Sequence, residues 1–152
     1  MSRLIFQKLS RSPRIPTRRY FKLWTVAVLA DQKVEQTLLI RVVDRLEIIQ
    51  LNERYRGKQG VTNVLSFPFQ PLLVDDVRAE SKFLGEVILC APVINLEARQ
   101  LNQHYLNYWA HLVIHGTLHL LGFDHETLAK ARVMERLEAV YLRRLGYSVD
   151  FF

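Results

Sequence analysis

Three histidines late in the chain have the spacing that a single divalent metal ion requires. His115 and His119 are four residues apart, and His125 follows after Gly122. Residues four apart in a helix share one face and differ by about 6 Å along the axis, so both imidazoles can reach one ion. A glycine in a left-handed turn can end such a helix and bring His125 back as a third ligand. The segment therefore predicts a zinc site with one Zn²⁺ per chain.

Three protein ligands leave one coordination position of zinc open, which is typical of catalytic rather than structural sites. Two other interpretations remain. In the first, the three residues are ordinary helix histidines with no metal. In the second, the single cysteine, Cys90, is a fourth ligand and closes the site. Imidazole also binds nickel, copper and iron, so the ligand types alone do not select the metal.

The histidine spacing matches that of the metzincin proteases, with one difference that changes the chemistry. The pattern H-x-x-x-H-x-x-G-x-x-H is retained, but Gly116 occupies the position of the metzincin glutamate. That glutamate is the general base in peptide hydrolysis, and glycine cannot accept a proton. A peptidase would need a base from elsewhere in the chain, whereas phosphoester chemistry at a histidine-bound metal stays open.

His111 lies one helical turn before the predicted metal ligands and on the same face. About 12 Å along the axis separates it from His119, too far for both to bind one zinc through bonds of about 2 Å. We interpret His111 as a substrate-binding or pocket-wall residue, or as a hydrogen-bonding neighbour of a ligand. The alternative is a core histidine bonded to a backbone carbonyl.

A second segment, residues 56–68, has the composition of a phosphate-binding turn. Arg56 and Lys58 lie beside Gly57 and Gly60, before a predicted edge strand that begins at Thr62 and carries Asn63. Backbone N–H groups and a guanidinium fork can bind phosphate in such a turn. With a metal site elsewhere in the chain, this segment becomes a candidate for the positive half of a phosphoryl site. Lys58 and Asn63 are then predicted to bind substrate.

These segments require a scaffold, and the chain alternates predicted strands with predicted helices. Strands are expected over residues 4–9, 37–43, 62–69 and 84–90, with a polar loop over 71–82. Helices are expected after Thr17 and Asp44, over residues 92–102 and 105–121, and from Thr127 to a stop at Gly146. Pro68 confines the end of its strand to a sheet edge or a bulge. The predicted fold class is α+β, a single domain over residues 1–152 with a mixed sheet packed against helices and a metzincin-like zinc-binding helix.

Helical spacing also predicts which side chains face the core. The expected inward residues are Tyr20, Leu23, Trp24, Ala27 and Val28 in the first helix, Leu46, Ile49, Gln50 and Glu53 in the second, and Leu128, Ala131, Met134, Leu137, Tyr141 and Leu145 in the last.

The composition describes a globular protein with a basic surface. Apolar residues make up 49% of the chain and charged residues 24%, with a formal net charge of +6. A single cysteine excludes an internal disulfide framework, and no apolar run approaches the roughly 18 residues of a membrane helix. The positive charge favours a polyanionic partner, so RNA fits better than a peptide. We expect a cytoplasmic protein with no membrane association.

Basic residues are concentrated at the N-terminus. Those from Arg3 to Lys22 all precede the first acidic residue, Asp31. A basic, serine-containing segment before the apolar residues 23–30 resembles a transit or secretory signal. The interpretation that we favour is a strand followed by a helix, with the arginines forming a solvated surface that contacts phosphates.

Taken together, the two functional segments resemble the YbeY family of bacterial endoribonucleases. The shared motifs, in family order, are Leu51-Asn52, Tyr55-Arg56-Gly57-Lys58, residues 62–68, Leu84-Gly85-Glu86 and residues 115–125. The resemblance spans the chain from the first predicted strand to the last helix. Three positions depart from the family pattern: Gln59 and Glu86, where aspartate is usual, and Val61, where proline is usual. None of them is a predicted ligand, so they bear on loop shape more than on chemistry.

This resemblance implies a zinc-dependent, single-strand-specific endoribonuclease that acts in 16S ribosomal RNA 3′-end maturation and 70S ribosome quality control. The implied partners are ribosomal RNA and the ribosome or small-subunit components. It also implies that His115, His119 and His125 bind the metal and that Arg56 is the activity-linked arginine. Zinc would then polarise a phosphate oxygen or a water while Arg56 stabilises the growing negative charge.

The general base stays unassigned by the sequence. Asp124 is a candidate to orient an imidazole or to accept a proton, and the alternative is that it helps to cap the last helix. Two other functional classes remain open. One is a zinc metallopeptidase of metzincin-like geometry, in which an edge strand pairs with an extended peptide. The other is a non-catalytic ribosome-assembly factor with a structural metal.

Overall fold

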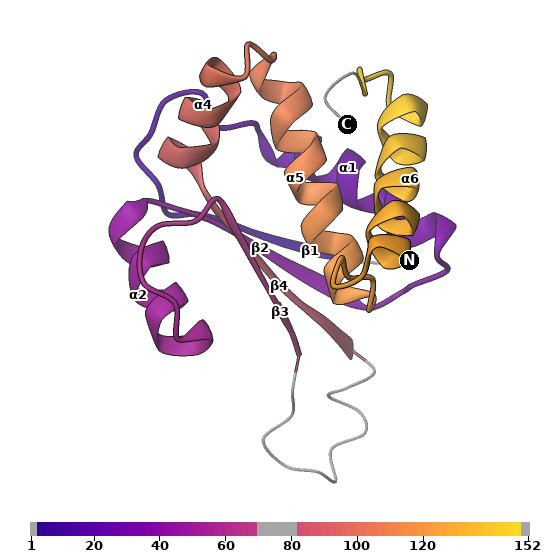
Figure 1. Cartoon of the computed structure of the whole chain (residues 1–152), viewed down its shortest axis with the longest axis horizontal. Helices are drawn as coiled ribbons and strands as arrows, with labels where there is room; N and C mark the ends of the chain where they lie inside the picture. The colour runs from indigo at the N-terminus through magenta and orange to yellow at the C-terminus, as the bar shows by residue number, and fades with distance from the viewer. Residues whose placement is uncertain (1–2, 70–81, 150–152) are drawn as a thin grey trace, which may run out of the picture.

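A mixed four-stranded sheet lies at the centre of this computed structural model, which describes residues 3–69 and 82–149 (Figure 1). The strands are β1 (Leu4–Lys8), β2 (Thr37–Val43), β3 (Val64–Pro68) and β4 (Phe83–Cys90), in the spatial order β1-β2-β4-β3. The β1–β2 and β2–β4 pairs are parallel, and β3 runs antiparallel to β4. Pro68 therefore lies at the end of an edge strand, where a missing N–H donor is tolerated.

Helices cover both faces of the sheet. They are α1 (Arg18–Asp31), α2 (Arg45–Arg56), α4 (Ala91–Gln100), α5 (Tyr105–Leu120) and α6 (Leu128–Arg144). Figure 1 shows α1, α5 and α6 grouped together on one side, with α2 separate from them on the other. This arrangement confirms the predicted α+β class with a mixed sheet packed against helices. The predicted loop over residues 71–82 lies almost entirely outside the described residues.

Alternation along the strands divides the apolar residues between the two faces. On β4, Val87 and Leu89 pack into the main core with α1 and α5, whereas Ile88 and Cys90 pack with Ile48 of α2 in a smaller cluster. This is the two-residue period expected of a strand that is covered on both faces. Because α5 contacts the sheet and three other helices, most of its surface is buried.

The predicted elements are confirmed to within a few residues, but some predicted inward faces are wrong. Leu23, Leu46 and Leu128 are 50%, 68% and 71% exposed. In α2 the buried residues are Ile48 and Asn52, which are four apart and share one face. Leu46 is two residues before Ile48, a rotation of about 200°, and therefore lies on nearly the opposite side of the helix. Which face a helix buries is set by the sheet it meets, and these helices have apolar residues on more than one side.

The basic N-terminal segment forms part of the fold. β1 pairs with β2, and Phe21 and Trp24 of α1 are fully buried in the main core. Removal of this segment would expose that core, which counts against its interpretation as a cleavable signal. None of the helices in the described ranges is long and apolar enough to cross a membrane.

Candidate metal site and cationic pocket

The C-terminal end of α5 holds two of the predicted ligands and turns to present the third. Gly122 adopts φ +96°, and its N–H donates to the carbonyl of His119 at 3.0 Å. The Phe123 N–H donates to the carbonyl of Leu118 at 3.2 Å. The predicted left-handed turn at Gly122 is therefore confirmed, and it brings the following segment back toward the helix.

The three histidines converge on one point. One ring nitrogen from each of His115, His119 and His125 lies within 4.8 Å of the others, and the Nε2 atoms of His115 and His119 are 3.1 Å apart. Tetrahedral zinc with bonds of about 2.0–2.1 Å separates two ligand nitrogens by about 3.4 Å, so the cluster fits such an ion. No other such group of His, Cys, Asp or Glu side chains occurs in the described ranges. Cys90 packs in the smaller core cluster and cannot be a fourth ligand.

A buried carboxylate behind the histidines was not predicted. Glu138 of α6 accepts from His115 Nδ1 at 2.6 Å through Oε2 and contacts His111 Nε2 at 3.3 Å through Oε1. Its side chain is only 3% exposed. The carboxylate fixes the orientation of the His115 ring and leaves Nε2 directed at the cluster, as carboxylate partners of metal-binding histidines do.

The electrostatics of the cluster suit metal binding. Burial opposes ionisation of Glu138, but hydrogen bonds and charges from His111 and His115 outweigh it and lower the pKa of Glu138 to about 2. Burial, then the charges of His115 and His125, lower the pKa of His119 to about 4. His119 is therefore a neutral imidazole near pH 7, which is the form that binds a metal.

A pocket of about 520 Å³ joins the histidines to the predicted phosphate-binding turn. It lies where the end of α2, the edge strand β3 and the end of α5 approach one another. Its lining includes every predicted site residue except His111: Arg56, Lys58, Asn63, His115, His119 and His125. The positive charge of Arg56 is one of the causes that lower the pKa of His119, so the two sides interact electrostatically.

The cationic turn is closed by a buried amide. α2 ends as Gly57 adopts φ +63°, and the Gly57 N–H donates to the Glu53 carbonyl at 3.2 Å. The side chain of Asn52, which is buried, donates to the Gly60 carbonyl at 3.2 Å. Arg56 and Lys58 remain exposed at the pocket. The turn thus presents two cations opposite the histidines.

Comparison with known proteins assigns this combination to a family. A family model described as endoribonuclease YbeY matches residues 9–146. The chain belongs to the YbeY endoribonuclease family. Among proteins named endoribonuclease YbeY, that of Nitrosococcus oceani is 44% identical over 88% of this chain and 86% of its own. That of Methylococcus capsulatus is 43% identical over 94% and 91%.

The fold agrees with a solved structure. The solution structure of TM1509 from Thermotoga maritima matches with a TM-score of 0.57 and 22% sequence identity, covering 93% of this chain and 92% of that chain. At this identity, the likeness concerns the fold alone.

In this member of the YbeY family, the predicted substrate-binding residues Asn63 and His111 make hydrogen bonds to glutamates of the fold. The side chain of Asn63 lines the pocket but donates to Glu97 at 3.0 Å. His111 lies against Glu138, as a hydrogen-bonding neighbour of the cluster, and outside the pocket lining. Substrate binding by Lys58, Asn63 and His111 stays a prediction.

Asp124 has a local role in the structure. It accepts from the Glu126 N–H at 3.0 Å and lies 3.6 Å from Lys130, so it stabilises the turn before α6. The helix itself is capped by Thr127, which accepts from the Lys130 N–H at 3.1 Å. The Glu126 N–H, above all, lowers the pKa of Asp124, which makes this carboxylate a weak base.

Gly116, the departure from the metzincin pattern, is explained by packing. A Cβ at this position would lie 2.8 Å from Val87 Cγ1 and 3.1 Å from Ser66 Oγ. Ser66 Oγ also donates to the Gly116 carbonyl at 3.0 Å. A glutamate at this position would force the side chains of Val87 and Ser66 to shift, so glycine is the residue that fits between α5 and the sheet.

A signal for Glu138 was present in the sequence. It lies four residues after Met134 and three before Tyr141, both of which are buried on α6. A carboxylate in a buried stripe requires a partner, and the histidines of α5 supply it. Glu86, one of the family departures, pairs with Arg41 of β2. It stabilises the sheet and does not line the histidine pocket.

Proposed function

We propose that this chain is a zinc-dependent, single-strand-specific endoribonuclease that acts in 16S ribosomal RNA 3′-end maturation and 70S ribosome quality control. Its partners would be ribosomal RNA and the ribosome or small-subunit components, and its location the cytoplasm. The observation that carries the proposal is the pocket that joins three convergent imidazoles to Arg56 and Lys58. The names of the relatives, endoribonuclease YbeY, support the reaction class.

The histidine side of the pocket would hold the metal. His115, His119 and His125 supply three nitrogens, and zinc in that position supplies positive charge beside a phosphate oxygen and increases the acidity of water. Glu138 accepts the Nδ1–H of His115 and so keeps its Nε2 lone pair on the pocket side. The low pKa of His119 keeps its ring neutral and able to bind.

The cationic side of the pocket would hold the RNA backbone. The guanidinium of Arg56 can form two parallel hydrogen bonds to phosphate oxygens, and Lys58 adds a second charge. Negative charge grows on those oxygens in the transition state, so Arg56 stabilises that state more than the ground state. Both side chains are exposed, which lets them follow a flexible single strand.

One observation favours a peptidase as the second candidate. β3 is an edge strand that lines the pocket, and an extended peptide could pair with such an edge. Gly116 opposes this candidate because the metzincin base has no room there. The carboxylates of the pocket lining are Asp124 and Glu126, and Asp124 is a weak base.

The test uses the full chain, stripped by a chelator and then supplied with zinc. A precursor 16S ribosomal RNA, a fully paired RNA and a panel of fluorogenic peptides would be incubated with each preparation. We expect cleavage of the precursor only after zinc is restored, with the paired RNA and the peptides intact. Peptide turnover with intact RNA would favour the peptidase. Bound zinc with neither activity would favour a ribosome-assembly factor with a structural metal.

A further inference from the structure

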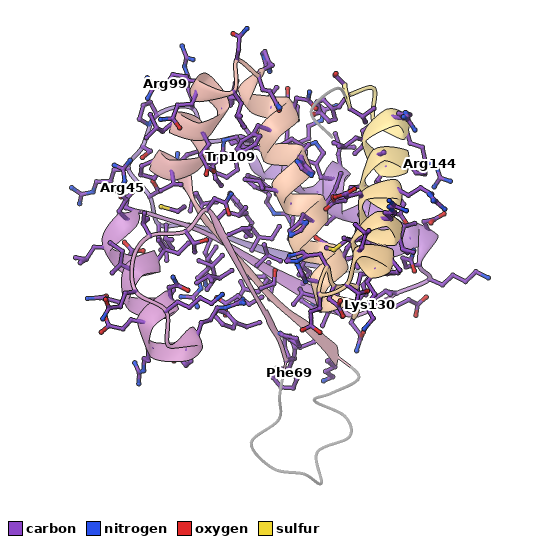
Figure 2. All side chains as sticks on the ribbon, viewed as in Figure 1. Arg45, Phe69, Arg99, Trp109, Lys130 and Arg144 are labelled. Atoms are coloured by element: carbon purple, nitrogen blue, oxygen red, sulfur yellow. The ribbon has the colours of Figure 1, made fainter. Side chains whose placement is uncertain are left out.

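A second pocket, of about 1010 Å³, lies away from the histidine cluster. Four basic side chains line it: Arg14 before α1, Arg45 at the start of α2, Arg99 near the end of α4 and His104 at the start of α5. No aspartate or glutamate is in the lining. Figure 2 shows Arg45 and Arg99 on the side of the molecule opposite α6, which carries Arg144 and Lys130.

Two acidic residues are adjacent in sequence to this lining, and both accept hydrogen bonds. Glu97 accepts from Tyr108 and Asn63. Asp44 precedes Arg45 and accepts hydrogen bonds from the hydroxyls of Ser10 and Ser12 and from the Arg11 N–H. Its charge therefore secures the connection between β1 and α1. The guanidinium groups of Arg14, Arg45 and Arg99 are on exposed residues, so solvent and ligands can reach them.

One wall of the basic pocket is held in place by a chain of hydrogen bonds that starts from a buried tryptophan. Trp109 is fully buried, and its Nε1 donates to Asn95 Oδ1 at 2.8 Å. Asn95 Nδ2 in turn donates to the carbonyls of Pro13 at 3.1 Å and Arg14 at 3.4 Å. Arg14 has φ +58°, a left-handed conformation that is strained for a non-glycine residue. Such strain persists where the surrounding structure enforces it, and it occurs most often at binding sites.

The lining also offers apolar surface beside the cations. Leu96 is 37% exposed, and the rings of His104 and Tyr105 lie 5.2 Å apart between centroids. Guanidinium groups bind phosphate in a bidentate manner, and aromatic and apolar surfaces accept the face of an unpaired base. This pairing of features fits a nucleotide unit better than an acidic peptide, which offers carboxylates but no planar base.

The two pockets are connected through two helices. Helix α2 places Arg45 at the basic pocket and Arg56 at the histidine pocket. Helix α5 begins after His104 at the basic pocket and places His115 at the histidine pocket. Eleven residues separate the two ends in each helix, a rise of about 16 Å, which corresponds to about five stacked nucleotides at about 3.4 Å each.

We propose that the basic pocket lined by Arg14, Arg45, Arg99 and His104 is a second RNA-binding site, which holds a phosphodiester and base of a single strand away from the histidine cluster. The inference deepens the proposed endoribonuclease function and rests on it for the choice of RNA. The site anchors the strand, and it takes no part in bond cleavage.

The test compares two charge-matched double variants of the full chain with zinc supplied. The first is Arg45→Gln with Arg99→Gln, and the control is Arg136→Gln with Arg143→Gln on α6, where both residues are exposed. Affinity for a labelled single-stranded oligonucleotide would be measured over a range of salt concentrations. Two lost phosphate contacts should reduce the slope of log K against log salt by about 1.4, at about 0.7 per contact. The control should keep the wild-type slope.

Cleavage by the same proteins separates failure of the anchor from failure of the proposed function. We expect a raised KM and an unchanged kcat for Arg45→Gln with Arg99→Gln, because the histidine cluster is intact. A reduced binding slope without cleavage by any protein would support the RNA site and reject the nuclease. If Arg45→Gln with Arg99→Gln bound RNA with the wild-type affinity and the wild-type dependence of log K on log salt, the second RNA site would be overturned. Binding of an acidic peptide or a small phosphate to the pocket would not rescue it.

Discussion

The two sides of the histidine pocket differ in how firmly the fold holds them. On one side, His115 and His119 project from a buried helix, and the Glu138 carboxylate, 3% exposed, orients His115. On the other, Arg56 and Lys58 are exposed on a turn that is closed by backbone hydrogen bonds and by the side-chain amide of Asn52. Metal binding requires fixed geometry because zinc bonds are short, whereas phosphate binding by long cationic side chains tolerates movement.

This difference predicts that substitutions on the two sides will have separable effects. Changes among the histidines and Glu138 should alter zinc content first and cleavage as a consequence. Changes among the cations should leave zinc in place and alter cleavage or RNA affinity.

The largest effect is expected from His119→Ala. The substitution removes one of the three nitrogens of the predicted site, in which the Nε2 atoms of His115 and His119 are 3.1 Å apart. Loss of a residue that only supports a ligand typically lowers metal affinity by up to about 100-fold, so the loss of a ligand should lower zinc affinity by more than that. Cleavage should disappear with the metal. Zinc per chain and cleavage would be measured together, with Arg132→Ala, at an exposed position of α6, as the control. Full zinc content in His119→Ala would remove this residue from the ligand set.

Arg56→Ala should separate the two sides most clearly. Zinc content should equal that of the wild type, while kcat falls by about 10²–10³-fold, the loss typical when one group that stabilises transition-state charge is removed. The measurement is single-turnover cleavage of the precursor RNA at saturating zinc.

Arg54→Ala is the matched control for this arginine, since Arg54 lies two residues earlier on α2 and stacks on Tyr55 at 5.5 Å. It should retain cleavage. Equal cleavage by Arg56→Ala and the wild type would exclude Arg56 from the mechanism.

Glu138→Gln should weaken the firmly held side without removing a ligand. The glutamine keeps the side-chain volume but lacks the negative charge of the carboxylate, whose Oε2 accepts a hydrogen bond from His115 Nδ1 at 2.6 Å. Zinc affinity should fall by about 10–100-fold, and excess zinc should restore cleavage. A competitive zinc titration measures this change, with exposed Glu135→Gln on the same helix as the control. Unchanged affinity would show that the carboxylate does not support the metal.

The smallest effect is expected from Lys58→Gln. Loss of one phosphate contact should reduce the salt slope of single-strand binding by about 0.7 and leave zinc content unchanged. Lys22→Gln on α1 changes the same charge away from the pocket. An identical slope in Lys58→Gln and Lys22→Gln would remove Lys58 from the RNA contact.

The sequence predicted the features that depend on local spacing. The predicted ligands lie within eleven residues, so helix geometry and Gly122 are enough to bring them together. The strand and helix positions and the edge location of Pro68 were also predictable from local residue types. The cap was not: Asp124 was a candidate for it, whereas Thr127 caps the last helix. The family resemblance supplied the role of Arg56, which no local pattern specified.

Features that depend on how elements dock were not predicted. Glu138 reaches His115 only because α6 packs on α5, and a single sequence does not contain that pairing. Leu23, Leu46 and Leu128 were wrongly predicted to face inward for the same reason, since each fits a helical period but is exposed in the folded chain. The predicted inward residues Met134 and Tyr141 of α6 are buried. The reason for Gly116 likewise became visible only beside Val87.

The central claim is that zinc on the histidines and the cations opposite act as one nuclease site. The most direct measurement is the rate of precursor RNA cleavage as zinc is added back to stripped protein, with bound zinc determined in each sample. We predict that the rate rises in proportion to bound zinc and reaches its maximum at one per chain. Full cleavage by the stripped protein, or none at one zinc per chain, would contradict the claim.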